Sequence, residues 1–342
     1  MRCAPPGEVI LDRYRPFVEG AIRTLVEGRP DVALYWMLRY HLGYADPEGR
    51  PVSASGGKGV RSALCLLGCQ AAGGDPVSAA PAGAALELIH GFTLIHDDIA
   101  DQDELRRGRP TVWALWGVGQ AITAGDAMYA LANLAVERAD PRQVPAEIAL
   151  AVMRDLNEAI LQVCEGQQLD LSYQGRDDIE LDEYLAMIGL KTAALFRAAA
   201  SAGARIARAE DGAISALGGF GFQLGLAYQI RDDILGLWGH PGEMGKPVGG
   251  DLRQNKRSLP IVLALASGDA ELRSRVAGGG ASEEETVALA SRMQEAGIQA
   301  KCEQLAREHL AEAVGQLDRA DLAAGPKADL RTLATYLVAR TR

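Results

Sequence analysis

Apolar residues recur along most of the chain at intervals of three and four positions, the spacing that places them on one face of an α-helix. The stretch from Leu11 to Gly28 follows this pattern and stops at a glycine, which is typical of a helix end. Longer stretches with the same pattern cover residues 79–103, 146–174 and 214–239. They predict long helices, and the first of these three is apolar until it reaches a group of aspartates.

One later helix is predicted from its start signal. Ser282 is followed three residues on by Glu285, which is the capping-box pattern, directly after a glycine loop. No run of alternating apolar and polar residues predicts a strand, and no break is long enough to be a domain linker. We therefore expect a single all-α domain over residues 1–342, with ten or more helices.

Composition and charge narrow the function. The net charge of −10 disfavours a nucleic-acid partner, which would need clustered Lys and Arg. No apolar run of eighteen residues predicts a membrane span, and the N-terminus turns acidic too soon for a secretory signal. The cysteines lack a second Cys/His pair that would complete a zinc site, so we expect structural thiols in a reducing cytoplasm. The five are Cys3, Cys65, Cys69, Cys164 and Cys302.

The glycine-rich segment GGFGFQLG resembles a nucleotide-binding fingerprint only superficially. The spacing G-x-G-x-x-G fails at Leu224, and no strand precedes the segment. Glycines on a helix instead allow a neighbouring helix to approach closely. Close helix packing is therefore the prediction for Gly218, Gly219, Gly221 and Gly225.

Candidate chemistry begins with the acidic stretch HDDIADQDELRRGRP. Asp97, Asp98 and Asp101 form D-D-x-x-D, in which the first and last carboxylates lie one helical turn apart on the same face. Their repulsion at the end of an apolar helix requires compensation, and Mg²⁺ prefers such oxygen ligands. A solvated acidic helix end is the alternative. A second pair, Asp232 and Asp233, follows another apolar run and favours the metal interpretation.

Two carboxylate pairs on two long helices could face each other across a cavity that holds several Mg²⁺ ions and a polyphosphate. Basic residues that could bind such an anion are present near helix ends, where arginine would bind phosphate bidentately and lysine as a point charge. They are Lys58, Arg61, Arg106, Arg107, Lys191, Lys246 and Lys256.

Six motifs in order resemble those of the trans-isoprenyl diphosphate synthases, the head-to-tail prenyltransferases. The motifs are GGKGVR, ELIHGFTLIHDDIADQDELRRGRPT, GLKTAALF, YQIRDDILG, GKPVGGDL and NKRSLP, from about Gly56 to Pro260. The resemblance implies an all-α isoprenoid synthase fold with a helical bundle around a central cavity. It also implies a homodimer and a cytoplasmic enzyme with three Mg²⁺ ions per active site.

The same resemblance implies roles for the acidic residues. Asp97 and Asp101 would ligate two Mg²⁺ ions on the allylic diphosphate, with Asp98 in support. Asp232 would hold a third ion, and Asp233 belongs to the same metal group. Bound metal would help the allylic diphosphate to ionise, and the resulting cation would be attacked by isopentenyl diphosphate.

The remaining roles concern the two diphosphates and the cation. Arg106, Lys191 and Lys246 would contact the allylic diphosphate, and Lys256 is a further substrate-binding candidate. Thr192 and Gln229, with Lys191, would lie where the cation forms. His96 is expected to pack or to support the metal site. The diphosphate of isopentenyl diphosphate would be bound by Lys58, Arg61, His90 and Arg107.

The chain departs from the family pattern in two places. Gly236 stands where the second motif ends in aspartate, which puts the third Mg²⁺ in question, and Gly59 stands where some relatives carry arginine. For chain length, Phe92 lies five residues before Asp97 and is the expected floor of the product tunnel, with the smaller Thr93 beside it. This pattern favours the C20 product, geranylgeranyl diphosphate, from C5 to C15 primers; farnesyl diphosphate is the alternative.

Other functions on the same scaffold make different demands. A terpene cyclase would carry a hydroxyl and an acid after the second motif, and this chain has neither there. A non-catalytic partner subunit would tend to lose the first aspartates or the basic loop, and both are present. An irregular prenyl coupling enzyme is left open by the motifs.

Overall fold

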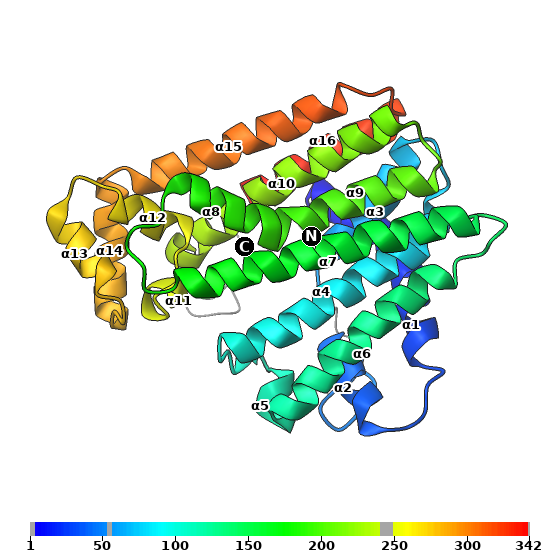
Figure 1. The fold of residues 1–342 in the computed structure, drawn as a ribbon, viewed down its shortest axis with the longest axis horizontal. Helices are drawn as coiled ribbons and strands as arrows, with labels where there is room; N and C mark the ends of the chain where they lie inside the picture. The colour runs from blue at the N-terminus through cyan, green and yellow to red at the C-terminus, as the bar shows by residue number, and fades with distance from the viewer. Residues whose placement is uncertain (1–3, 53–56, 240–248, 341–342) are drawn as a thin grey trace. The chain divides into compact units, whose positions relative to one another are not determined.

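The computed structural model describes residues 4–52, 57–239 and 249–340, which group into two compact units, each built from three chain segments. Unit 1 comprises residues 1–157, 198–218 and 319–333, and unit 2 comprises residues 158–197, 219–318 and 334–342. Four of the five boundaries fall inside helices, namely α7 (Ala146–Tyr173), α9 (Ala194–Ile206), α10 (Asp211–Trp238) and α16 (Ala324–Ala339), and the fifth, between residues 318 and 319, falls in the connection that precedes α16. The described chain is helical almost throughout, as expected (Figure 1). The organisation as one domain stays a prediction.

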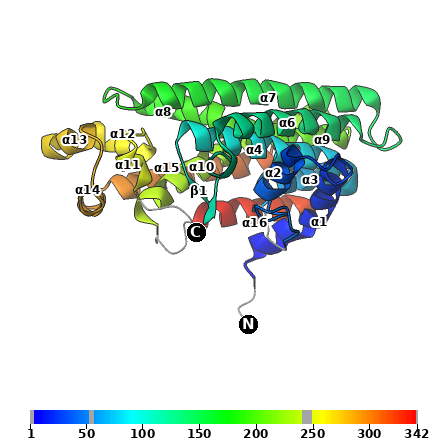
Figure 2. The same cartoon turned by 90° about the horizontal axis from the view of Figure 1, so that it is seen from below.

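The helices that lie wholly within unit 1 surround α4. They are α1 (Pro6–Val26), α2 (Ala33–His41), α3 (Val60–Ala71), η1 (Pro76–Ala79), α4 (Ala80–Ala100), α5 (Val112–Trp116) and α6 (Val118–Glu137). Helix α4 packs most extensively on α6 and also contacts α3 and α1, and α4 and α6 lie side by side in both views (Figures 1 and 2). Leu86, Leu88 and Ile89 on α4 are at most 1% exposed. Burial of each such side chain contributes about 1.5–3 kcal/mol, so α4 holds its C-terminal end rigidly.

The segments that lie wholly within unit 2 form its own packed group. They are α8 (Leu181–Ile188), the π-helical η2 (Gly189–Ala193), α11 (Gly250–Arg253), α12 (Leu259–Leu265), α13 (Ala270–Ala277), α14 (Glu283–Glu295) and α15 (Ile298–Leu317). Helix α12 contacts α8, α13 and α15. All seven residues of α12 are buried, so this short helix is the centre of the group.

Close packing is confirmed for two of the four predicted glycines, Gly219 and Gly225. A Cβ on Gly225 would lie 2.6 Å from Ala193 Cα, and a Cβ on Gly219 would lie 2.9 Å from Gln316 Oε1. The predicted capping box is also present, because Ser282 accepts from the backbone of Glu285 and its own N–H donates to that side chain.

Two expectations about elements were incomplete. The first helix begins at Pro6 rather than near Leu11, because proline is favoured in the first helical turn. A small hairpin was missed: β1 (Leu105–Arg106) pairs antiparallel with β2 (Arg109–Pro110). Strands of two residues are too short to show an alternating pattern.

Two helical stretches, 76–100 and 181–206, are long and apolar enough to cross a membrane. However, 67% of each apolar window is buried inside the structure, as in the core helix of a globular protein. The expectation of no membrane span stays a prediction.

Candidate active site

The first aspartate motif lies at the C-terminal end of α4. Asp97 is the fourth residue from the helix end, and Asp101 is the C-cap, whose N–H donates to the Asp97 carbonyl at 2.8 Å. Both residues are partly exposed, whereas Asp98 is 1% exposed. The negative end of the helix dipole adds to the carboxylate charge and makes this helix end attractive to cations.

The paired arginines belong to the hairpin that follows α4. Arg107 and Gly108 form its two-residue loop with φ of 53° and 71°, which is a type I′ turn. The turn sends the two arginines in different directions. Arg106 Nε donates to Asp98 Oδ1 at 2.6 Å, and Arg107 lies beside Gly57, where a Cβ would be 3.0 Å from Arg107 Nη2.

The basic loop of Lys58 leads into α3. Gly59 is the N-cap of α3 with φ of 65°, a left-handed conformation that favours glycine. This gives a local reason for the glycine where some relatives have arginine. Burial and the nearby cations Arg61 and Arg107 hold the pKa of His90 well below its usual value, so this imidazole is neutral at pH 7. The structure therefore brings together three of the four residues predicted for isopentenyl diphosphate.

The predicted chain-length residues lie one to two turns before Asp97 on α4. The Phe92 ring is 8% exposed and packs edge-on against Tyr129 on α6, with the ring centres 5.7 Å apart. It packs in the same way against His96 at 5.9 Å, and His96 also lies near the Ile122 carbonyl on α6. Thr93 Oγ1 donates to the His90 carbonyl, so the Thr93 hydroxyl is held against its own helix.

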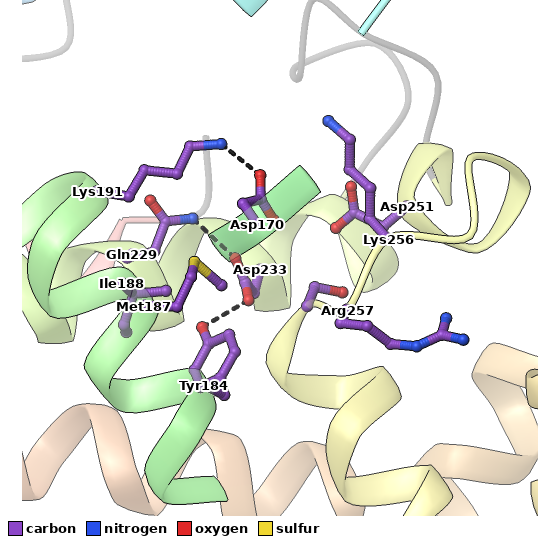
Figure 3. A pocket seen from close by; sticks show the side chains of 11 residues that line it. Asp170, Tyr184, Met187, Ile188, Lys191, Gln229, Asp233, Asp251, Lys256 and Arg257 are labelled. Carbon is purple, nitrogen blue, oxygen red and sulfur yellow. Dashed lines mark hydrogen bonds and ion pairs between the residues drawn. The ribbon is translucent and has the colours of Figure 1, made fainter. Parts of the chain in front are cut away.

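Unit 2 contains a small pocket of about 120 Å³ (Figure 3). The π-helical turn of η2 carries Lys191 and Thr192, and such turns are frequent at functional sites. Lys191 Nζ donates to Asp170 Oδ2 at 2.5 Å, and Thr192 Oγ1 donates to Gln229 Oε1 at 2.8 Å. Gly166 on α7 lets η2 approach this closely, because a Cβ at Gly166 would lie 2.2 Å from the backbone nitrogen of Lys191.

The second aspartate pair divides into two different environments. Asp232 has a side chain that is 38% exposed, and it forms an ion pair with Arg340, whose guanidinium stacks over the Tyr228 ring. Asp233 is 7% exposed and accepts three hydrogen bonds. Burial, together with the nearby Asp251 carboxylate, raises the pKa of Asp233 to about 7.

Gly236 leaves the end of the second motif without a side chain. A Cβ at this position would lie 3.8 Å from Asp251 Oδ2, so another carboxylate stands beside the missing one. Asp251 and the predicted Lys256 both line the pocket. Lys246 lies outside the described residues.

The acidic groups fit Mg²⁺ in their chemistry. Asp97, Asp101 and Asp232 are partly exposed residues with carboxylate oxygens, which are hard ligands. Among the described residues, no three Asp, Glu, His or Cys side chains converge to enclose an ion on their own. Mg²⁺ is commonly bound by one or two carboxylates together with water and phosphate oxygens, so the carboxylates of each motif taken separately fit it in their chemistry.

Two residues of the site were missed in the sequence. Asp170 accepts a hydrogen bond from Lys191. The only feature of the sequence that could have indicated it is an acidic residue on the buried face of a long helix. Arg340 pairs with Asp232 from the other end of the chain, and no pattern indicated it.

The all-α fold has one aspartate pair at the end of α4 and a second pair near the end of α10, which fits the isoprenoid synthase fold. The relatives of the chain identify it as a trans-prenyltransferase. The chain belongs to the polyprenyl synthetase family, whose model matches residues 50–293.

Similar proteins cover between 76% and 97% of the chain. It is 40% identical over 338 residues to the (2E,6E)-farnesyl diphosphate synthase of Mycobacterium bovis, covering 97% of this chain and 92% of that protein. It is 43% identical over 265 residues to the geranylgeranyl diphosphate synthase of Mycobacterium tuberculosis, covering 76% and 73%. A crystal structure of a polyprenyl synthetase from Streptomyces coelicolor superimposes with a TM-score of 0.89 at 37% identity, covering 96% and 99%.

Proposed function

We propose that this trans-prenyltransferase condenses isopentenyl diphosphate with C5–C15 allylic diphosphates and releases geranylgeranyl diphosphate. The observation that carries the chain length is Phe92, which is 8% exposed and backed by the rings of Tyr129 and His96. Five residues of helix separate it from Asp97, or about 7.5 Å along the axis. A packed aromatic group at that depth would stop the growing chain.

The basic residues of unit 1 support binding of isopentenyl diphosphate. Arg61 and Arg107 lie close enough to His90 to lower its pKa, so two permanent cations share one region. Arginine suits this task because its planar fork matches phosphate oxygens. The neutral His90 ring would donate a hydrogen bond to the same anion.

The carboxylates would act on the allylic diphosphate through bound Mg²⁺, and Lys191 would act through its own charge. Mg²⁺ held by Asp97, Asp101 and Asp232 would neutralise the charge of the leaving diphosphate. Lys191 would carry a positive charge toward the same group, in an orientation fixed by Asp170. The oxygens of Thr192 and Gln229 would face the cation that remains. Cytoplasmic location stays a prediction.

We also expect a homodimer. Val118 and Ile122 lie on one face of α6 and are 47% and 45% exposed. Large exposed apolar side chains on one helix face favour association with a partner, and a second copy of the chain is the expected one.

Farnesyl diphosphate is the second candidate product, because the Mycobacterium bovis relative matched over 97% of the chain carries that name. Labelled isopentenyl diphosphate would be incubated with Mg²⁺ and dimethylallyl, geranyl or farnesyl diphosphate, and the dephosphorylated products separated by length. A C20 alcohol from all three primers is expected. Accumulation at C15, with no elongation of farnesyl diphosphate, would overturn the C20 assignment.

A further inference from the structure

The carboxylate of Asp233 lies in the wall of the pocket in unit 2, where Figure 3 shows Tyr184 and Gln229 bonded to it. Its Oδ2 accepts from the Tyr184 hydroxyl at 2.7 Å and from the Leu259 N–H at 2.8 Å. Its Oδ1 accepts from Gln229 Nε2 at 2.8 Å. Both oxygens are therefore engaged by α8, α10 and the start of α12.

These contacts fix the orientation of the Gln229 amide. Both oxygens of Asp233 act as acceptors and Oδ1 accepts from Gln229 Nε2, so the amide turns its NH₂ toward Asp233 and its oxygen away. That oxygen accepts from Thr192 Oγ1 at 2.8 Å. The single hydroxyl proton of Thr192 is thereby committed to Gln229, and the remaining capacity of Thr192 Oγ1 is that of an acceptor.

The direction of this relay matters for a reaction that passes through a cation. Lone pairs stabilise a nearby positive charge, whereas a hydroxyl proton pointed at the cation would raise its energy. We propose that Asp233 and Tyr184 are positioning residues that set the direction of the relay through Gln229, so that Thr192 offers only acceptor lone pairs to the allylic cation. This inference rests on the proposed function.

The same contacts argue against Asp233 as a metal ligand, the role that the family resemblance gave it. An ion on either oxygen would displace one of the three donors. Tyr184 is only 1% exposed, so its hydroxyl would be left buried without its acceptor. Leaving a buried hydroxyl without a hydrogen bond costs about 1–3 kcal/mol of stability. Asp232, with its 38% exposed side chain, bears no such cost.

The variant Asp233→Asn tests the relay without changing its volume. The asparagine oxygen should take the place of Oδ2, because the Tyr184 hydroxyl and the Leu259 N–H both donate to that position. The NH₂ of the asparagine then faces Gln229. The Gln229 amide must then turn, which makes its NH₂ donate to Thr192 and sends the Thr192 proton into the pocket. We expect kcat to fall ~100-fold, comparable with the loss of one preorganised polar contact in other enzymes. KM for both substrates should stay within about twofold.

A binding measurement reports on the relay without turnover. The probe is an ammonium analogue of the allylic cation, titrated by calorimetry in the presence of Mg²⁺ and inorganic diphosphate. Asp233→Asn should lower the affinity for the ammonium probe at least ~10-fold and leave the affinity for a neutral isostere of the probe unchanged. Tyr184→Phe should lower the affinity for the ammonium probe by a smaller factor. Tyr173→Phe is the matched control, because Tyr173 is also buried in unit 2 and lies outside the relay.

The outcomes separate the two proposals. Equal affinity of wild type and Asp233→Asn for the ammonium probe would overturn the relay, whatever the activity. A tenfold rise in the Mg²⁺ concentration needed for diphosphate binding in Asp233→Asn would instead make Asp233 a metal ligand. If wild type binds the probe as expected but forms no prenyl product, the proposed function fails while the relay stands. Thr192→Val, added to Asp233→Asn, should cause no further loss.

Discussion

At the residue scale, similar side chains perform different tasks because their surroundings differ. Asp232 and Asp233 are neighbours in the sequence, yet the first has a partly exposed side chain beside Arg340 and the second is buried among three donors. Burial disfavours the charged form of a carboxyl, whereas hydrogen bonds to the carboxylate favour it. The balance of these effects sets the role of each aspartate.

Phe92 determines product length in this account, so Phe92→Ala should lengthen the product beyond C20. Removal of the ring opens the space between α4 and Tyr129, which the growing chain can enter. The measurement is the chain length of dephosphorylated products. Phe17→Ala, at a 42% exposed position on α1, should leave the distribution unchanged. An unaltered C20 product from Phe92→Ala would mean that the floor lies elsewhere.

His41 should make the stability of the protein depend on pH. Burial and the nearby Arg107 and Arg106 lower its pKa from 6.5 to about 3. Between these values the unfolded chain binds a proton that the folded chain does not, so the free energy of unfolding falls as pH falls. The loss is at most about 1.4 kcal/mol per pH unit. His41→Gln should reduce this slope in urea unfolding from pH 6.5 to 5; an identical slope would contradict the assignment.

At the element scale, turns and close approaches aim the functional side chains. The type I′ turn of the hairpin directs Arg107 toward Gly57, and the π-helical turn of η2 directs Lys191 toward Asp170. Both local geometries depend on a few residues, so substitutions can separate geometry from charge.

Arg107→Asn should keep the hairpin and remove the cation, because asparagine tolerates the left-handed φ of 53°. The loss of a charged hydrogen bond to phosphate, worth about 1.5–3 kcal/mol, should raise KM for isopentenyl diphosphate ~10- to 100-fold. KM for the allylic substrate should change little in steady-state assays. A rise confined to the allylic KM would reverse the assignment of Arg107.

Gly166→Ala should destabilise unit 2 by about 1–3 kcal/mol, because the new Cβ would overlap the backbone of Lys191. Gly315→Ala is the matched control on α15, where a Cβ meets nothing within 4 Å. That change should be neutral or stabilise the protein by up to about 1 kcal/mol. Urea unfolding of both variants checks the pair; equal stability of the two would show that α7 can shift away.

At the scale of the whole molecule, the sequence predicted the helices better than the contacts between residues far apart in the chain. Helical periodicity and the capping box of Ser282 depend on residues close together in the chain, so they were readable. Asp170 and Arg340 bond partners 21 and 108 residues away, which no local pattern reveals. The metal prediction for Asp233 treated adjacent carboxylates as equivalent, because sequence does not show which one is buried.

The homodimer gives a prediction at this scale. The double variant Val118→Lys with Ile122→Lys places two charges on the exposed face of α6 and should convert a dimer into a monomer in light scattering. Val287→Lys, at a 67% exposed position on α14, should stay dimeric. A double variant that remains a dimer would place the interface on another face.

The proposed condensation needs two diphosphate substrates, and the release of inorganic diphosphate is a direct test of it. The rate would be followed with Mg²⁺ and geranyl diphosphate alone, isopentenyl diphosphate alone, and both together. We predict rapid release only with both substrates, matched mole for mole by new carbon–carbon bonds in the product. Equally rapid release from geranyl diphosphate alone would contradict it and indicate a cyclase or hydrolase.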